Sequence, residues 1–387
     1  MPRVLFVATV VKTHIMEFHI PYIQMFQEAG WETAVAARND YEDPKDCMIP
    51  YCDNYYDIPF ARNPLHPSNV KAYRKLKKVI DEGNYDIIHC HTPVGGMLGR
   101  FAARHTRKRG TKVIYTAHGF HFFKGAPLLN WLVYYPAERW MAHYTDDLIT
   151  INKEDYNRAQ SFKAKRVHYV PGVGIDLDKF APPADATERQ REKDEKRREL
   201  MLKPDDFVVL SVGEVNKNKN HEVVIRAIGQ IKEQSQELYQ CLQYVICGRG
   251  PLQEELEKLA CTLNVDDHVH FLGYRTDIPQ ICHASDLFVF MSLREGLPVA
   301  LMEAMACGLP VMCSDVRGNR DLVHDGENGV LVDNIPEALA KHIYSYGNGK
   351  NVIRDNNEER QKVMESYDLV AVKEQMYQIY FDESVVE

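Results

Sequence analysis

The sequence predicts an α/β protein with two doubly wound parallel sheets in tandem. At 387 residues the chain is too long for one typical core. In both halves short β-rich runs alternate with helical stretches, the pattern of parallel sheets covered by helices. A Pro-containing, densely charged stretch at 181–200 interrupts the alternation and reads as a connector running into a surface helix. We therefore predict domains at 1–175 and 176–365, followed by a C-terminal helix over 366–387.

The first half begins with VLFVATVV at 4–11, a continuous apolar run typical of a strand buried on both faces. A helix at 20–30 follows at helical spacing, and Gly30 is its expected stop. Further strands are predicted at 32–37, 86–91, 112–117, 147–151 and 167–170, with helices at 68–82 and 95–109.

The same alternation restarts after the connector. Strands are predicted at 207–213, 242–248, 268–273, 287–292, 310–315 and 329–333, with helices at 220–233 and 251–264. Two doubly wound domains in tandem are expected to form a cleft between them. In such sheets, ligands bind at the carboxyl ends of the strands. Because this architecture serves many functions, the function must come from the residues at those ends.

Composition excludes several classes of protein. The chain is 45% hydrophobic and 26% charged, as soluble globular proteins are, and it holds no apolar run of about 18 residues. The N-terminal run lacks a small-residue cleavage site, so we expect a buried strand and a cytoplasmic protein. The nine cysteines form no Cys-x-x-Cys pair. His89, Cys90 and His91 alternate in direction along a strand and no second ligand cluster follows them, so no metal site is expected.

The charge differs between the two halves. Residues 1–170 hold 23 Lys and Arg against 17 Asp and Glu, whereas the remainder holds 24 against 38. This asymmetry favours two domains with different partners. Nucleic acid is a poor candidate, because the basic residues lack interleaved aromatic residues and the whole chain is acidic.

Two carboxylates follow the predicted strand at 287–292, in the segment EGLPVALME. Pro298 suits the first position of a helix that stops at Gly308, so the helix N-terminus opens at the carboxyl edge of the sheet, where a phosphate is favoured. Glu295 and Glu303 lie about 10 Å apart at helical rise, which suits acceptors of sugar hydroxyls at the two ends of a nucleotide diphosphate-sugar. For an isolated pair, a capping Glu and a surface Glu would be the simpler interpretation.

This segment, together with ACGLPVMCSDVRGNRDLVHDGENGVLV, resembles the retaining glycosyltransferases of family 4, which have the GT-B fold. TAHGFHFFKGAPLLNWLVYYPAERW, YVPGVGIDLDKF and GEVNKNKNH resemble the bacterial capsule and exopolysaccharide branch of that family. The resemblance covers nearly the whole chain. It implies two Rossmann-like domains facing across a cleft, with the acceptor domain first, the donor domain second and the C-terminal helix returning to the first. It also implies retention of configuration, no metal and no cofactor, the nucleotide-sugar being a co-substrate.

The resemblance implies roles for individual residues. Glu295 contacts the transferred sugar, Lys219 binds the diphosphate, and His118 lies near the donor sugar after the strand at 112–117. The further donor-binding residues that it implies are Glu303 at the ribose, Gly296, Leu297, Pro298 and Val299 at the phosphates, Gly213, Glu214 and Arg249 near them, and Gly273, Tyr274 and Arg275 at the base. On the acceptor side we expect Thr13, His14, His121 and Trp131.

The sequence departs from the family pattern at two places. The wider family has Arg directly after the glycine at 213, where this chain has Glu214. This removes a phosphate cation, and the candidates to replace it are Lys217, Arg249 and Arg275. The first βα loop carries Thr13 and His14 where many members have two glycines.

The aromatic segment FFKGAPLLNWLVYYP at 122–136 leaves two interpretations open. It is either a helix in the core of the first domain, or a rim with Trp131, Tyr134 and Tyr135 that meets a lipid-linked acceptor. Basic runs at 71–78 and 104–110 would add attraction to anionic lipid. Peripheral contact with the inner face of the plasma membrane therefore stays open.

We expect transfer from a UDP-sugar to a polyprenyl-diphosphate-linked glycan in cell-surface polysaccharide biosynthesis. No nucleophile stands out, so the leaving phosphate is expected to help take the acceptor proton. The alternative is a catalytically silent or partner-dependent nucleotide-sugar-binding subunit. An epimerase on the same fold would need other carboxylates, and a nicotinamide oxidoreductase would need Gly-x-Gly-x-x-Gly. Gly95, Gly96 and Gly99 lack that spacing, so close packing of a helix on a strand is their expected role.

Overall fold

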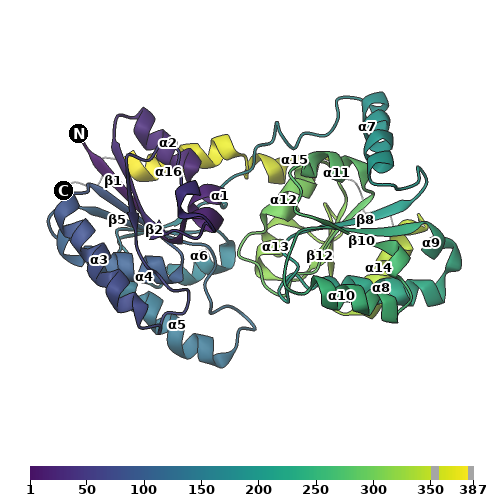
Figure 1. Ribbon diagram of the computed structural model, residues 1–387, viewed down its shortest axis with the longest axis horizontal. Coiled ribbons are helices and arrows are strands. Elements are labelled where there is room, and N and C mark those ends of the chain that lie inside the picture. Colours follow the sequence, from purple (N-terminus) through teal and green to yellow (C-terminus); the bar gives the residue numbers. More distant parts are fainter. Residues whose placement is uncertain (350–356, 382–387) are drawn as a thin grey trace. The chain divides into compact units, whose positions relative to one another are not determined.

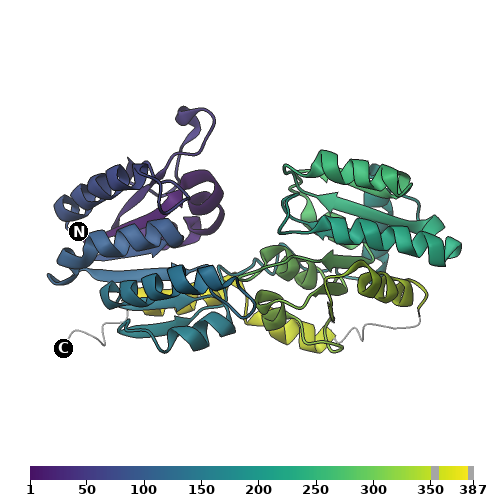
Figure 2. The ribbon, with the colours of Figure 1, turned by 90° about the horizontal axis from the view of Figure 1, so that it is seen from below.

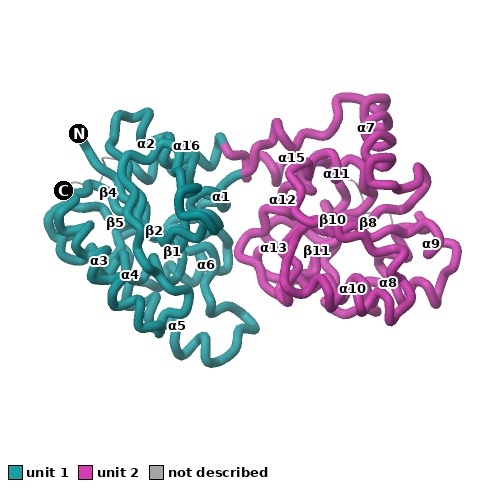
Figure 3. Tube along the Cα trace, in the orientation of Figure 1, with its two compact units in different colours: residues 1–174, 370–387 teal, residues 175–369 magenta. Residues whose placement is uncertain are grey.

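The computed structural model describes residues 1–349 and 357–381, and the chain forms two compact units (Figure 1). Unit 1 comprises residues 1–174 and 370–387, and unit 2 comprises residues 175–369 (Figure 3). Each unit has its own parallel sheet and its own hydrophobic core. The predicted fold class, two doubly wound α/β domains, is therefore confirmed.

Unit 1 contains a seven-stranded sheet in the order β3-β2-β1-β4-β5-β6-β7. All of its neighbouring strands run parallel. The strands are β1 (Arg3–Val10), β2 (Glu32–Arg38), β3 (Asn54–Asp57), β4 (Ile87–His91), β5 (Lys112–Ala117), β6 (Asp147–Thr150) and β7 (Arg166–Tyr169). The register pairs Phe6 with His89 and His91 with Thr116, so the carboxyl ends of β1, β4 and β5 are close to level.

Helices cover both faces of this sheet. They are η1 (Val11–Ile15), α1 (Met16–Phe18), α2 (Ile20–Glu28), η2 (Pro44–Asp46), α3 (Ser68–Gly83), α4 (Pro93–Arg107), α5 (Leu128–Met141), η3 (Ala142–Tyr144), α6 (Lys153–Ala159) and α16 (Leu369–Phe381). The cluster on one face takes side chains from α3 and α4, and the cluster on the other takes them from α2 and α16. The yellow helix α16 therefore lies against unit 1 (Figure 2).

Three glycines at the start of α4 allow it to approach the sheet closely. A Cβ on Gly96 would lie 2.3 Å from the Tyr115 ring, and one on Gly99 would lie 2.6 Å from the Cys90 sulfur. A Cβ on Gly95 would lie 3.1 Å from the backbone of Ala8. The expected packing role of these glycines is confirmed.

Unit 2 contains a six-stranded parallel sheet in the order β10-β9-β8-β11-β12-β13. Its strands are β8 (Phe207–Val212), β9 (Leu242–Cys247), β10 (Val269–Gly273), β11 (Leu287–Phe290), β12 (Val311–Ser314) and β13 (Val330–Val332). Its helices are α7 (Ala186–Glu199), α8 (His221–Gln234), α9 (Gln236–Cys241), α10 (Gln253–Thr262), η4 (Asp266–His268), α11 (Ile278–Ala284), α12 (Val299–Ala306), α13 (Arg317–Leu322), α14 (Pro336–Gly347) and α15 (Asn357–Glu365).

The charged stretch predicted as a connector and surface helix forms α7, which is mostly exposed. Several of its residues form ion pairs with the rest of unit 2, and Arg197 is the buried one among them. Arg197 is 2% exposed, donates from Nε to the Ala284 carbonyl at 2.9 Å and pairs with Asp286 at 2.7 Å. Among the described residues, no helix has the length and apolar character needed to cross a membrane.

Candidate active site

The segment between β11 and α12 holds the first of the two predicted carboxylates. Pro298 is the N-cap of α12, one position earlier than expected, because the helical residues begin at Val299. The helix ends as expected, since Gly308 has a left-handed φ of +78° and its N–H donates to the Met305 carbonyl at 3.1 Å. The N-terminus of α12 therefore opens at the carboxyl edge of the sheet of unit 2.

An ion pair joins two of the predicted catalytic residues. Lys219 Nζ lies 2.8 Å from Glu295 Oε1, and their side chains are 21% and 11% exposed. The same Nζ lies 4.5 Å from the centre of the Phe290 ring. Gly213 leaves room for the lysine, because a Cβ there would lie 3.2 Å from Lys219 Cε. A partly buried cation and carboxylate are thus held together beside the mouth of α12.

The backbone around this pair is held from two sides. Arg317, at the start of α13, donates from Nε to the Glu295 carbonyl at 3.1 Å. Asn218 donates from Nδ2 to the Arg294 carbonyl at 3.0 Å and accepts at its own carbonyl from the Leu293 N–H at 2.8 Å. The sequence interpretation gave Arg317 no role, although VRGNR directly follows the predicted strand at 310–315.

Glu303 lies inside α12, where its side chain is half-buried. Burial raises the pKa of this carboxyl to about 7, against the opposing charge of Lys179. The charge of the nearby Cys307 also raises the pKa of the Glu303 carboxyl. Glu303 is therefore poised to change charge near neutral pH.

The other predicted donor-binding residues differ in how exposed they are to solvent. Glu214 and Arg249 are exposed, and the Val215 N–H donates to the Arg249 carbonyl at 3.0 Å. Tyr274 is 68% exposed beside Gly273, whose φ is +68°. Gly296, Leu297 and Val299 are half-buried in the segment that leads into α12.

Arg275 is already bound to two carboxylates. It donates from Nε to Asp277 at 2.8 Å and from a terminal nitrogen to Glu199 at 2.8 Å. This pairing speaks against the expectation that Arg275 replaces the missing phosphate cation. Lys217 and Arg249, the other two candidates, are both exposed.

In unit 1, the predicted catalytic residue His118 belongs to a group of four histidines. Its Nε2 lies 3.4 Å from His91 Nδ1, and His14 Nε2 lies 3.2 Å from His19 Nε2. One ring nitrogen from each of the four lies within 4.8 Å of the others. We refer to His14, His19, His91 and His118 as the four-histidine group.

Burial sets the charge of this group. It lowers the pKa of His118 to about 4, and it also lowers the pKa values of the other three rings. The four imidazoles are therefore neutral at neutral pH. His89 lies outside the group, because its Nδ1 pairs with the Tyr380 hydroxyl and its Nε2 with Thr116, each at 2.8 Å.

We expected no second cluster of potential ligands after His89, Cys90 and His91, but the structure brings three further histidines to His91. His14, His19 and His118 converge on it from the segments after β1 and β5, far away in the sequence. A signal was present, since histidines end or directly follow three strands that lie side by side in the sheet.

A cavity of about 720 Å³ lies next to this group in unit 1 and is lined by three of the four predicted acceptor-side residues. Those residues are Thr13, His14 and His121. The Thr13 hydroxyl lies 3.1 Å from Asp40, and His121 stacks on Tyr134 with ring centres 4.7 Å apart. On the side of α5 the cavity is lined mainly by apolar residues, among them Leu129, Val133, Tyr134 and Met141, and Thr9 and Thr13 lie at the sheet edge.

Trp131, the fourth predicted acceptor residue, points elsewhere. It packs against Phe122 and Tyr135, and Arg158 lies 4.5 Å above its ring. Near the start of α5 the exposed apolar residues are aliphatic instead, although Trp140 near its end is also exposed. The aliphatic residues are Leu128 (74%), Leu129 (68%), Leu132 (66%) and Val133 (51%). Neither sequence interpretation of this segment is right in full, because its aromatic side chains face the core while its leucines face outwards.

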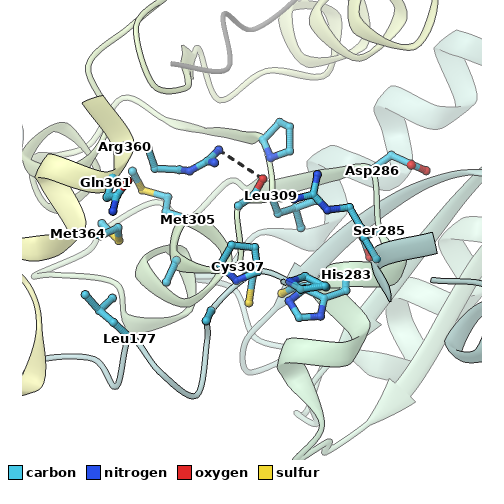
Figure 4. A pocket seen from close by; sticks show the side chains of 18 of the residues that line it. Leu177, His283, Ser285, Asp286, Met305, Cys307, Leu309, Arg360, Gln361 and Met364 are labelled. Atoms are coloured by element: carbon cyan, nitrogen blue, oxygen red, sulfur yellow. Dashed lines mark hydrogen bonds between the residues drawn. The ribbon is translucent and has the colours of Figure 1, made fainter. Parts of the chain in front are cut away.

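A second cavity, of about 740 Å³, lies in unit 2 at the other end of α12 (Figure 4). Cys282, His283 and Cys307 line it. A hydrogen bond from Cys282 and contact with His283 lower the pKa of the Cys307 thiol to about 6. His283 Nδ1 lies 3.0 Å from Glu192. Nothing in the sequence pattern assigned these residues a role.

Comparison with known proteins identifies the family. Residues 192–364 match the family described as glycosyl transferases group 1, and residues 22–179 match Glycosyltransferase Family 4. The chain is 40% identical to glycosyltransferase EpsD of Bacillus subtilis (strain 168) over 381 residues, which cover 98% of this chain and 96% of EpsD. It is 31% identical to the UDP-Gal:alpha-D-GlcNAc-diphosphoundecaprenol alpha-1,3-galactosyltransferase of Escherichia coli over 330 residues, 83% of this chain and 82% of that enzyme.

Solved structures agree on the fold. HepE of Anabaena, in complex with UDP and glucose, matches with a TM-score of 0.76 at 19% identity, over 99% of this chain and 100% of HepE. WaaG, a glycosyltransferase involved in lipopolysaccharide biosynthesis, matches with a TM-score of 0.72 at 18% identity, over 98% and 99%. The chain belongs to the family 4 glycosyltransferases and has their GT-B fold.

Proposed function

We propose that this glycosyltransferase moves a sugar from a UDP-sugar to a polyprenyl-diphosphate-linked glycan, with retention of configuration, during cell-surface polysaccharide biosynthesis. The transfer itself uses no metal in this proposal. The observation that carries the proposal is the pairing of Lys219 with Glu295 beside the mouth of α12.

That pairing suits a diphosphate leaving group. Negative charge grows on the leaving diphosphate as the glycosidic bond breaks, and a positioned ammonium group stabilises it. The N-terminus of α12 adds backbone N–H groups and a favourable dipole. When the donor binds, Lys219 turns to the phosphates and Glu295 accepts hydrogen bonds from the hydroxyls of the transferred sugar. Glu303 accepts from the ribose hydroxyls.

His118 is suited to the sugar rather than to the phosphate. A neutral imidazole has one nitrogen that accepts a hydrogen bond and one that donates. In the proposed step, the acceptor oxygen forms its bond to the anomeric carbon on the face from which the diphosphate leaves. A phosphate oxygen takes the acceptor proton, so no protein nucleophile is required.

Relatives support the choice of substrates. The name of the E. coli relative specifies UDP-Gal and a diphosphoundecaprenol-linked acceptor, and HepE was solved with UDP and with UDP-glucose. In this chain, the lipid part of such an acceptor would contact the cavity beside α5 and the exposed leucines of that helix. We propose peripheral contact of α5 with the cytoplasmic face of the plasma membrane on the same grounds.

The test is mass spectrometry of the products formed from a panel of UDP-sugars and a bacterial lipid extract. We expect one UDP-sugar to give a lipid-linked product enlarged by one sugar. Absence of both transfer and slow donor hydrolysis for every UDP-sugar would contradict the proposal. Binding of UDP with transfer only after co-expression with a partner protein would instead identify a partner-dependent binding subunit.

A further inference from the structure

The four-histidine group has the geometry of a metal site. One ring nitrogen from each of His14, His19, His91 and His118 lies within 4.8 Å of the others. A tetrahedral zinc ion holds its nitrogen ligands at about 2.0–2.1 Å, which places them about 3.4 Å from one another. Two separations in the group, 3.2 Å and 3.4 Å, already match that value.

The four rings of the group differ in how deeply they are buried. His19 and His91 are each 1% exposed, and their ring centres lie 3.7 Å apart. His14 and His118 are less buried, so rotation of their side chains can close the wider separations. The widest nitrogen separation exceeds the ideal edge by at most about 1.4 Å, and the rings of His19 and His91 must also move apart to bind one tetrahedral ion.

Hydrogen bonds satisfy the two most buried rings of this group only in part. Among the described residues, His19 Nδ1 and His91 Nε2 are buried without a hydrogen-bond partner. Buried polar atoms are paired in the great majority of cases, so two orphan nitrogens in one cluster need an explanation. Among the described residues, the other nitrogen of each ring contacts only another histidine of the group, so no residue outside the group fixes the orientation of these two rings by a ring hydrogen bond.

The donor atoms define the class of ion. Imidazole nitrogens suit Zn²⁺, Cu²⁺ and Ni²⁺, whereas Mg²⁺ and Ca²⁺ require oxygen ligands. His14 also lines the 720 Å³ cavity of unit 1, which gives an ion a path to the group.

We propose that the four-histidine group binds a divalent transition-metal ion and that the bound ion inhibits sugar transfer. Inhibition follows because the ion uses the nitrogen lone pair with which His118 would accept a hydrogen bond from the donor sugar. This second part rests on the role of His118 in the proposed function. The proposed binding of the ion does not depend on that role.

Metal binding is tested on the full-length protein after treatment with a chelator. Zn²⁺ binding is measured by competition with a chromophoric chelator, and Co²⁺ gives the visible absorption of a tetrahedral site with nitrogen ligands. The variants are His14→Gln and His118→Gln, whose side chains are less buried. His105→Gln, on the exposed face of α4, is the matched control.

We expect one Zn²⁺ per chain in the wild type and in His105→Gln. Each variant of the group should bind on the order of 100-fold more weakly, as loss of a ligand costs at least as much as loss of an outer-shell partner. Zn²⁺ should also raise the melting temperature of the wild type but not of His14→Gln. Equal zinc binding by the wild type and both group variants would overturn the proposal, and so would no binding by the wild type.

The activity arm separates this proposal from the proposed function. Transfer should be inhibited by Zn²⁺ in the wild type and restored by a chelator. If zinc binds as expected and transfer is unaffected, the proposed metal site is supported. The proposed inhibition and the assigned role of His118 are then contradicted. If transfer is measured and zinc does not bind, the metal site falls and the proposed function stands.

Discussion

At the scale of single residues, the donor side is organised by a cation and a carboxylate that neutralise one another before the donor arrives. The Lys219–Glu295 ion pair keeps both side chains in place at 2.8 Å, with little exposure of either. In the proposed function, a donor that binds there supplies a phosphate for the lysine and hydroxyls for the carboxylate. The pair is therefore a preorganised arrangement with two separable functions.

Replacing Glu295 by Gln should separate the two functions. The variant keeps the shape of the side chain but loses the charge-assisted contacts with the transferred sugar, so kcat should fall on the order of 100-fold. UDP has no transferred sugar, so its Kd, measured by calorimetry, should change only a few-fold. Glu254→Gln, an exposed position on α10, is the control. Equal losses in turnover and in UDP binding would contradict the assignment of Glu295 to the transferred sugar.

The raised pKa of Glu303 predicts a pH dependence of UDP binding. Below about pH 7 the free protein holds this carboxyl protonated, because burial opposes its charge. Ribose hydroxyls bind the ionised form better, so binding releases a proton and affinity should rise by up to about tenfold per pH unit until the pH passes 7. Calorimetry at several pH values checks this. UDP itself titrates in the same range, so the control is Glu303→Gln, in which the slope assigned to the carboxyl should vanish.

Cys307 should be unusually reactive towards alkylation. The Cys282 hydrogen bond and His283 lower the pKa of its thiol to about 6, so much of it is thiolate at neutral pH. Labelling with iodoacetamide, followed residue by residue by mass spectrometry, should be half-maximal near pH 6. His283→Gln should move that midpoint upwards. A midpoint near the ordinary thiol value of about 8.5 in the wild type would contradict this prediction.

At the scale of elements, the sequence predicts most strands because fully buried strands are continuous apolar runs. β3 was missed, since Asn54–Asp57 is a short edge strand with only partly buried side chains. The α12 region was predicted almost to the residue, because Gly308 and the two carboxylates are local signals. The four-histidine group could not be predicted in the same way, because its members converge only through the register of β1, β4 and β5. The direction of the side chains of α5 could not be predicted from the sequence either, because most residues in the first half of that helix are apolar or aromatic.

The outward-facing leucines of α5 predict membrane binding. Replacing Leu128, Leu129 and Leu132 together with Ser should weaken co-sedimentation with vesicles of anionic lipid by at least about 1,000-fold, because the three leucines together lose at least about 4.5 kcal/mol of apolar burial. Val70→Ser, which alters another exposed apolar residue of unit 1, should bind as the wild type does. Unchanged binding by the triple variant would exclude α5 as the membrane contact.

At the scale of the whole molecule, the chain ends in the unit in which it begins. Helix α16 follows unit 2 in sequence, yet its buried face completes the core of unit 1 through Val372, Met376 and Tyr380. The Tyr380 hydroxyl also bonds to His89 in β4 at 2.8 Å. The stability of unit 1 therefore depends on a helix that follows unit 2 in the sequence.

This dependence predicts where damage to α16 should appear. Met376→Ala should lower the free energy of unfolding of unit 1 by about 2–5 kcal/mol, because it leaves a cavity beside the sheet. Hydrogen exchange read by mass spectrometry should show faster exchange in β1 and β4 and no change in β8 and β11. Val370→Ala is the matched control, since Val370 is 73% exposed on the same helix and should shift stability by less than about 0.5 kcal/mol. Faster exchange in β8 and β11 would show instead that α16 supports unit 2, against the packing described above.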